Sequence, residues 1–147
     1  MKNIIITNYQ TAVAETLQSA AGNKFTVKPI VPQTQADKCA AAFVEVAPGE
    51  SAYGYHWHEE NEEIFYVIAG EALVKTESGE IRLRAGDAIA FSANEKGAHV
   101  MMNPSKTEKL VYLDFGTANK PDVVHFAGTE TGLVVSRSGV FPFSENH

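Results

Sequence analysis

Short hydrophobic runs, divided by turn residues, follow one another along the chain from residue 25 onward. The runs are FTVKPIV (25–31), CAAAFVEVA (39–47), YGYHWH (53–58), EEIFYVIAGEALVKT (62–76), EIRLRAG (80–86), DAIAFSA (87–93), AHVMMN (98–103), KLVYLDFG (109–116), DVVHF (122–126) and LVVSR (133–137). Runs of this length, with no helical pattern between them, are typical of antiparallel strands in a sandwich or a barrel. The pattern therefore predicts an all-β fold.

The N-terminal part of the chain has a different pattern. Residues 11–21 (TAVAETLQSAA) are rich in alanine and are followed by a Gly-Asn pair, which predicts a short helix and its end. Pro29 lies inside the first hydrophobic run and lacks the N–H group that a central strand needs, so we expect that strand at a sheet edge. Ser78 and Gly79 lie between two later runs and predict a hairpin turn.

Composition and charge narrow the possible partners. The chain has 147 residues, enough for one domain, and its formal net charge of -6 with scattered basic residues disfavours nucleic acid and anionic membranes as partners. Cys39 is the single cysteine, so no intrachain disulfide can form and nothing indicates an oxidising compartment. The sequence shows no apolar segment long enough for a signal peptide or a membrane span, so we expect a cytoplasmic protein.

Histidines and carboxylates gather in the stretch GYHWHEENEE (54–63). Side chains alternate between the two faces of a strand, so His56 and His58 point the same way and Trp57 points the other way. Two imidazoles on one face at this spacing can converge on a single ion. The same alternation places Tyr53 and Tyr55 with Trp57, on the face that we expect to pack away from the site.

A carboxylate and a third histidine are available on other runs. After a sharp turn, either Glu62 or Glu63 can lie beside the histidine pair, and His99 supplies another imidazole from the run 98–103. If these runs are neighbours, three nitrogens and one oxygen surround one point. Such a mixed set of ligands suits Fe, Mn, Co, Ni, Cu or Zn as a divalent ion. Glu59 and Glu60 are interpreted as solvated acids of the loop.

Three apolar residues share faces with these ligands. They are Phe65, Val67 and Met101, and we expect them to line a pocket around the ion. The alternative interpretation is that they pack in the core of the barrel. His125 lies outside the histidine-rich stretches and is interpreted as a surface residue. Residues 139–147, GVFPFSENH, are expected to pack over one end of the fold or against a partner.

The segment HWHEENEEIFYVIAG (56–70) resembles the first signature of the cupin superfamily: His, one residue, His, four residues, Glu, six residues, Gly. On that spacing the glutamate is Glu63. The segment GDAIAFSANEKGAHVMMN (86–103) resembles the second signature, with His99 as its ligand, although Ser92 stands where proline is usual and the loop before His99 is longer. The resemblance extends from about Ala40 to Val124 and is to small bacterial single-domain cupins of unassigned function.

This resemblance implies an antiparallel jelly-roll β-barrel preceded by the short N-terminal helix. Residues 1–30 then form the helix and an edge strand, residues 31–125 the cupin barrel core, and residues 126–147 a C-terminal strand and tail, all in one domain. The resemblance also implies one divalent transition metal held by His56, His58, Glu63 and His99, and a homodimer.

Two classes of function follow from these expectations. One is a metal-dependent enzyme that acts on a small oxygenated organic compound, as a dioxygenase or a sugar-type isomerase. The other is a non-catalytic cupin that binds or senses a small-molecule ligand. The sequence contains no HExxH, GxSxG, Walker or dinucleotide-binding motif, and no general acid or base can be assigned from it.

Overall fold

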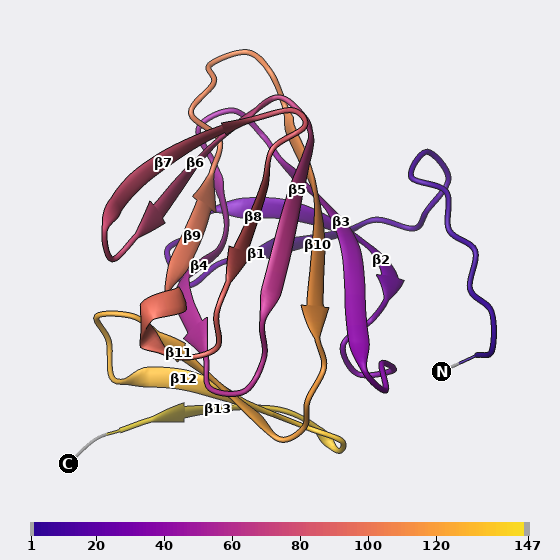
Figure 1. Cartoon of the computed structure of the whole chain (residues 1–147), viewed down its shortest axis with the longest axis vertical. Coiled ribbons are helices and arrows are strands. Elements are labelled where there is room, and N and C mark those ends of the chain that lie inside the picture. The colour runs from indigo at the N-terminus through magenta and orange to yellow at the C-terminus, as the bar shows by residue number, and fades with distance from the viewer. Residues whose placement is uncertain (1, 146–147) are drawn as a thin grey trace.

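Two antiparallel β-sheets stacked face to face make up the computed structural model, which describes residues 2–145 (Figure 1). The first sheet contains, in spatial order, β1 (Glu15–Gln18), β2 (Lys24–Val31), β3 (Cys39–Val46), β10 (Leu110–Thr117), β5 (Glu63–Ala69) and β8 (Ala88–Phe91). The second contains β13 (Gly139–Ser144), β12 (Thr131–Ser136), β11 (Asp122–Phe126), β4 (Ser51–His58), β9 (His99–Met102), β6 (Glu71–Thr76) and β7 (Gly79–Arg84). The all-β expectation is confirmed, and the ten predicted runs all contribute to strands.

The hydrophobic core lies between the sheets and comes mainly from alternate residues of the central strands. Along β5, for example, Phe65 and Val67 are buried whereas Ile64 and Tyr66 are exposed. The core residues are Phe25, Val27, Val44, Val46, Ala52, Phe65, Val67, Ala72, Val74, Phe91, Met101, Leu110 and Tyr112. The strands β1, β11, β12 and β13 contribute no residue to this core. The end of the sandwich that they form contains a cavity, described below.

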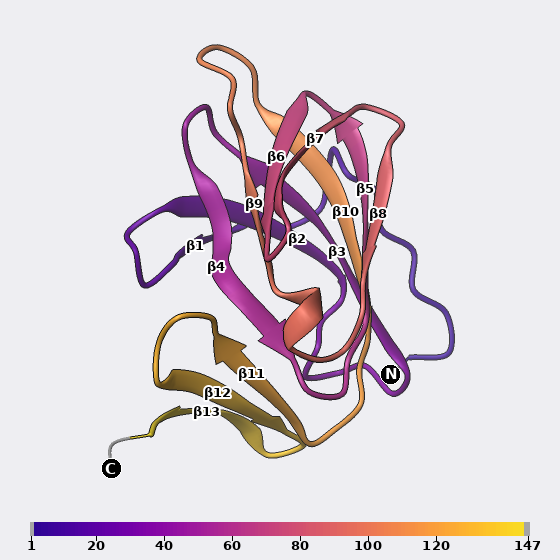
Figure 2. The same ribbon diagram turned by 60° about the vertical axis from the view of Figure 1, so that its left-hand side comes forward.

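The expected closure into a barrel is wrong. In the described part of the chain, the first sheet ends at β1 and β8 and the second ends at β13 and β7. Each of these four strands pairs with a neighbour on one side only, within its own sheet. A barrel requires end strands to pair with each other, so the molecule is a sandwich with open edges (Figure 2).

The predicted N-terminal helix is also wrong, because part of residues 11–21 forms β1. Strand β1 pairs with β2, with Glu15 opposite Val27 and Gln18 opposite Lys24. A helix of this length is marginally stable alone. As a strand, the same segment forms backbone hydrogen bonds with β2. The helical structure among the described residues is one 3-10 turn, η1 (Glu95–Gly97). No helix within residues 2–145 is long and apolar enough to cross a membrane.

The structure confirms the predicted hairpin turn but not the predicted edge strand. The hairpin predicted at Ser78 and Gly79 joins β6 to β7, with Thr76 paired to Gly79. Strand β2 is not an edge strand, because β1 covers it as far as Val27. Pro29 lies beyond that pairing, opposite Ala42 of β3 and next to an irregularity in register, so β1 requires no N–H group from it. The C-terminal segment forms the hairpin of β12 and β13, which the sequence did not predict.

Gly70 joins β5 to β6 at the end of the first histidine-containing segment and has a φ of 81°. A Cβ atom here would lie 2.5 Å from the carbonyl oxygen of Lys109. We expect Gly70→Ala to lower the free energy of unfolding by about 2–3 kcal/mol. Alanine is strained in the left-handed conformation, and its Cβ atom would also clash with the Lys109 carbonyl oxygen. Urea unfolding, followed by circular dichroism, measures this loss.

Gly128 provides the matched control for that substitution. Its φ is 77°, but a Cβ atom would meet nothing within 4 Å. Gly128→Ala therefore carries the conformational strain alone, and we expect it to cost about 1–2 kcal/mol. Equal losses in the two variants would show that the close approach of Lys109 has no role.

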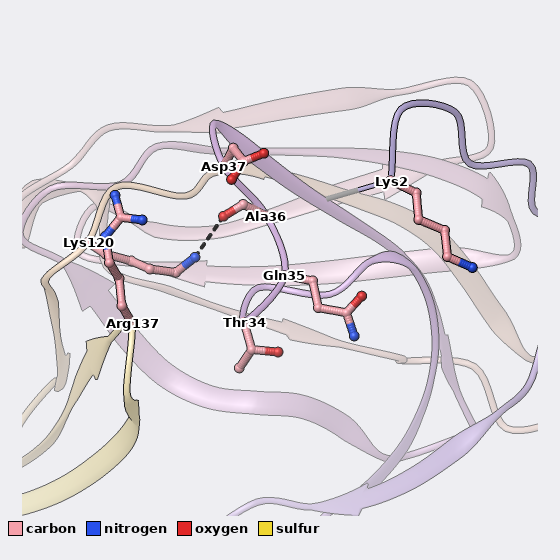
Figure 3. Close-up of a pocket in the computed structure, with 7 residues that line it drawn as sticks. All are labelled: Lys2, Thr34, Gln35, Ala36, Asp37, Lys120 and Arg137. Carbon is pink, nitrogen blue, oxygen red and sulfur yellow. Dashed lines mark hydrogen bonds between the residues drawn. The ribbon is translucent and has the colours of Figure 1, made fainter.

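A pocket of about 530 Å³ lies where the loop between β2 and β3 meets the segments after β10 and β12 (Figure 3). It is lined by Lys2, Thr34, Gln35, Ala36, Asp37, Lys120 and Arg137. The Lys120 ammonium donates a hydrogen bond of 2.8 Å to the carbonyl oxygen of Ala36. We refer to this group of residues as the lysine-arginine pocket, since three of its side chains are cationic.

Candidate metal centre

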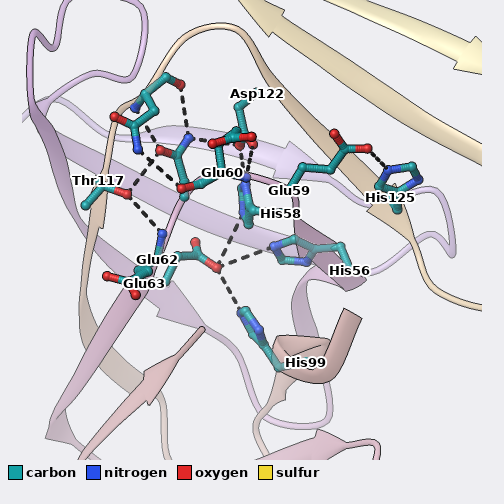
Figure 4. A network of polar contacts seen from close by, with 12 residues as sticks. His56, His58, Glu59, Glu60, Glu62, Glu63, His99, Thr117, Asp122 and His125 are labelled. Carbon is teal, nitrogen blue, oxygen red and sulfur yellow. Dashed lines mark hydrogen bonds and ion pairs between the residues drawn. The ribbon is translucent and has the colours of Figure 1, made fainter. Parts of the chain in front are cut away.

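Strand pairing brings the predicted histidines together from distant parts of the chain. His56 and His58 lie on β4, and His99 begins β9, where it is the pairing partner of His56. Glu63 begins β5 in the opposite sheet, after the loop 59–62, and faces the histidines across the sandwich (Figure 4). Glu62 is exposed, so of the two glutamates that alternation left open, Glu63 is the one that reaches the histidines.

One oxygen of Glu63 lies at the centre of this arrangement. Its Oε2 atom is 3.2 Å from Nε2 of His99, 3.5 Å from Nε2 of His58 and 3.7 Å from Nε2 of His56. The ligand atoms of His56, His58 and Glu63 all lie within 4.8 Å of one another. All four side chains are largely buried, and His99 is 2% exposed. The four predicted residues are therefore neighbours in space.

The second nitrogen of each histidine ring is already engaged. Nδ1 of His56 contacts the Gly54 carbonyl oxygen at 2.8 Å, and Nδ1 of His99 contacts that of Gly97 at 2.8 Å. Nδ1 of His58 lies 2.7 Å from Oδ2 of Asp122. Each of these partners is an acceptor, so Nδ1 carries a proton in each ring, and Nε2 faces Glu63, where it presents a lone pair whenever the ring is neutral.

With the rings neutral, as metal binding requires, this arrangement leaves acceptor atoms facing each other. Nε2 of His58, Nε2 of His99 and Oε2 of Glu63 are buried and have no hydrogen-bond partner within residues 2–145. Buried acceptors without donors are costly, and a cation at their centre would satisfy all of them. The residues thus fit a divalent transition metal bound by imidazole nitrogens and a carboxylate.

Packing fixes the orientation of the His99 ring. The ring stacks on Phe91, with centroids 3.5 Å apart and planes 11° from parallel, and it meets Phe65 edge on at 5.3 Å. Since neither aromatic ring can move without opening the core, Nε2 of His99 is held toward Glu63.

Asp122 is the residue of the site that the sequence did not reveal. It is 1% exposed, lies on β11 and contacts His58 across 64 positions in the chain. Its carboxylate also accepts hydrogen bonds from the Glu60 amide at 2.9 Å and from the Asn61 side chain at 2.9 Å. No sequence motif distinguishes an aspartate at the start of a hydrophobic run. Only the pairing of β11 with β4 shows that Asp122 lies beside His58.

The contacts of Asp122 and Glu63 set the charge of the site. Burial alone would lower the pKa of His58, but its hydrogen bonds to Asp122 and Glu63 raise that pKa to about 10. Without a metal, His58 therefore carries a proton on Nε2 as well, and a bound metal would take the place of that proton. Burial opposes ionisation of both carboxylates, yet contacts with the histidines hold the pKa of Glu63 well below its usual range and lower that of Asp122. The site is therefore built to keep two carboxylates ionised beside the imidazoles.

Tyr53 lies on a different side of β4 from the one that strand alternation predicts. Tyr53 and Gly54 both have positive φ, of 63° and 101°, and the pairing of β4 with β9 shifts register between Ala52 and His56. This irregularity re-aims the side chain, so that Tyr53 packs on Phe25 with ring centroids 4.5 Å apart and lines the same cavity as His56. Burial raises the pKa of Tyr53 well above its usual value.

Trp57, Glu59 and Glu60 of the histidine-rich stretch supply no side-chain contact to the cluster. Trp57 stacks on His125 with ring centroids 4.1 Å apart, and Nε2 of His125 lies 2.7 Å from the Glu59 carboxylate. Glu59 and Glu60 are exposed. This agrees with their interpretation as loop acids, and it gives His125 a partner on the surface (Figure 4).

A cavity of about 590 Å³ opens beside Glu63, toward the end of the sandwich formed by β1, β2 and β11 to β13. Its lining includes His56, His58 and Glu63. Phe65, Val67 and Met101, expected to line a pocket, belong instead to the hydrophobic core and are absent from this lining. This position agrees with their alternative interpretation as interior residues, and Phe65 still contacts the His99 ring edge on.

Asp114 lies on the wall of the same cavity. It belongs to β10, where it is opposite Phe65 of β5, and it shares the cavity with Glu63. Burial raises the pKa of Asp114 well above its usual value, and the negative charge of Glu63 raises it further. Tyr112, two residues away on the same strand, is fully buried in the core.

Comparisons with known proteins agree on the fold. A "Putative sugar phosphate isomerase" from Acidithiobacillus ferrooxidans is 21% identical, with a TM-score of 0.80 over 95% of this chain and 91% of that one. A sugar phosphate isomerase of the cupin superfamily from Silicibacter pomeroyi is 20% identical, with a TM-score of 0.73 over 82% and 76% of the two chains. The polyketide cyclase RemF from Streptomyces resistomycificus is 20% identical, with a TM-score of 0.69 over 86% and 85%.

At such identities these likenesses establish the fold and nothing more. No curated protein matches the sequence. The Cupin_2 model, described as a cupin domain, matches residues 42–116, a stretch that runs from β3 to β10 and includes His56, His58, Glu63 and His99. The chain therefore belongs to the cupin family.

Proposed function

We propose that this protein is a metal-dependent enzyme that acts on a small oxygenated organic compound. In this proposal one divalent transition metal is held by His56, His58, Glu63 and His99. The observation that carries the proposal is the convergence of three imidazole Nε2 atoms and a carboxylate oxygen on one buried point, with distances of 3.2–3.7 Å from Oε2 of Glu63. Among the described residues, Nε2 of His58, Nε2 of His99 and Oε2 of Glu63 have no hydrogen-bond partner.

The surroundings supply what a catalytic site needs besides the ion. When bound, a metal of this class supplies Lewis acidity or redox chemistry. Asp122 fixes the tautomer and the orientation of His58. The cavity beside Glu63 gives a compound of moderate size access to the cluster.

Asp114 favours proton transfer over oxygen chemistry. Its carboxyl group lies on the cavity wall with Glu63 and accepts no hydrogen bond from the described residues. A carboxyl group in that position can hold or accept a proton of a bound compound. We therefore favour isomerisation, in which a proton moves between two carbons of the compound, over dioxygenation.

Elemental analysis of protein purified without added metal tests the proposal. We expect about one equivalent of a first-row divalent metal per chain, because the site offers four protein ligands. Iron or copper would point toward oxygen chemistry, and zinc or manganese toward isomerisation. A protein that contains no such metal, and takes up none from solutions of Mn(II), Fe(II), Ni(II) or Zn(II), would contradict the proposal.

A further inference from the structure

The cavity beside Glu63 has a distinctive charge. Its lining, within the described residues, includes no lysine and no arginine. Four carboxylic side chains do line it: Glu15, Glu63, Asp114 and Asp122. Away from the metal centre, a phosphate group placed in this cavity would meet apolar and carboxylic side chains and no lysine or arginine, so these walls offer a phosphorylated compound no cationic partner.

The walls of the cavity away from the cluster are apolar and come from both sheets. Strand β2 supplies Val27, Pro29 and Val31 on one side, and β11 and β12 supply Val124, Leu133 and Val135 on the other. Such walls favour the apolar body of a ligand, because burying apolar surface between them removes it from water. The volume of about 590 Å³ is also larger than a single sugar ring requires.

We propose that the cavity binds an uncharged organic molecule with an apolar body, oriented with an oxygen-bearing end toward Glu63, and that it discriminates against phosphorylated sugars. The orientation of the oxygen-bearing end rests on the metal centre of the proposed function. The preference for an apolar body rests on the walls alone. The ligand class therefore differs from the sugar phosphates named for two structures of the same fold.

The lysine-arginine pocket does not supply the missing cation. It adjoins the cavity at Thr34, which lines both. Its cationic side chains belong to Lys2, Lys120 and Arg137, none of which lines the cavity. The Lys120 ammonium is moreover directed to the carbonyl oxygen of Ala36 (Figure 3). A phosphate attached to a short sugar at Glu63 would remain among apolar and acidic side chains.

Isothermal titration calorimetry of the metal-loaded protein with three probes tests the inference. The probes are 2-naphthol, 2-naphthyl phosphate and glucose 6-phosphate, of which the first two differ only by the phosphate group. We expect saturable binding of 2-naphthol, with at least about tenfold weaker binding of each phosphorylated probe. A phosphorylated probe that binds as tightly as 2-naphthol, or 2-naphthol that fails to saturate the protein, would overturn the inference.

Two neighbouring residues on β13 show whether the probe occupies this cavity. Val140 lines the cavity and is 48% exposed, whereas Phe141 is 52% exposed and is absent from the lining. Both sites tolerate a polar residue because water already reaches them. We expect Val140→Asp to weaken 2-naphthol binding about tenfold, because a carboxylate enters an apolar wall, and Phe141→Asp to leave it unchanged. Equal effects of the two substitutions would place the probe elsewhere and overturn the inference.

The same titration on chelator-treated protein separates this inference from the proposed function. If the protein holds no metal but 2-naphthol still binds and responds to Val140→Asp, the metal centre is wrong while the apolar preference of the cavity stands. If the metal is present and glucose 6-phosphate is the tighter ligand, the proposed metal centre stands and the ligand class is wrong.

Discussion

His58→Ala and His99→Ala are each expected to reduce the bound metal from about one equivalent per chain to background, because each removes a ligand that no neighbouring side chain replaces. Nε2 of each ring lies within 3.5 Å of Oε2 of Glu63 and is otherwise unpartnered. Elemental analysis after dialysis measures the occupancy. Circular dichroism and thermal melting show whether each variant remains folded.

Glu59→Ala and Glu60→Ala are the matched controls for the loss of metal. Both glutamates lie in the loop that connects β4 to β5, and both are exposed. Glu59 contacts His125 on the surface rather than the cluster. We expect full metal occupancy in both control variants. Metal lost from either control would show that the wrong carboxylate has been assigned, and full occupancy in both histidine variants would remove the metal centre altogether.

Asp122→Ala is expected to weaken metal binding and to destabilise the fold. The substitution leaves three donors without their acceptor: Nδ1–H of His58, the Glu60 amide and the Asn61 side chain. Leaving such buried groups unpaired is expected to lower the free energy of unfolding by about 3–5 kcal/mol. Loss of the partner that orients a histidine ligand typically weakens metal affinity about 10–100-fold.

Asp122→Asn separates these two effects. The amide oxygen of asparagine can replace one of the two carboxylate oxygens, but the NH2 group then faces a donor that the other oxygen accepted from, so we expect a smaller loss of stability with metal affinity still about tenfold weaker. Competition with a chelator measures the affinity, and urea unfolding measures the stability. Asp87→Ala is the control, because its carboxylate also accepts a backbone N–H, that of Arg84, in an exposed turn away from the cluster. Unchanged metal affinity in both Asp122 variants would show that the contact with His58 has no effect on the metal.

The cluster of His56, His58 and Glu63 was predictable because its information is local. His56 and His58 are two positions apart, which puts both on one face of β4. The interval from His58 through Glu63 to Gly70 fits a turn and then a strand, which ends at a glycine with left-handed backbone conformation. His99 was predictable from the second motif. That these residues bind a metal stays a prediction.

Other features could not be predicted because contacts between distant segments determine them. The alanine-rich segment around Glu15 becomes a strand because β2 offers it backbone partners. Tyr53 faces the cavity because an irregularity in β4 breaks the alternation of side chains. Asp122 meets His58 because β11 pairs with β4, and the intervening chain carries no sign of that pairing.

The sequence by itself thus determined the strand content, the family signatures and the residues proposed as ligands, since period and spacing act within a few residues of one another. The tertiary structure alone decided that the sheets remain an open sandwich, that Asp122 supports His58, and that the cavity beside Glu63 has apolar walls without lysine or arginine. These properties depend on which strands become neighbours, and that choice follows from burial and hydrogen bonding across the whole chain rather than from any local pattern.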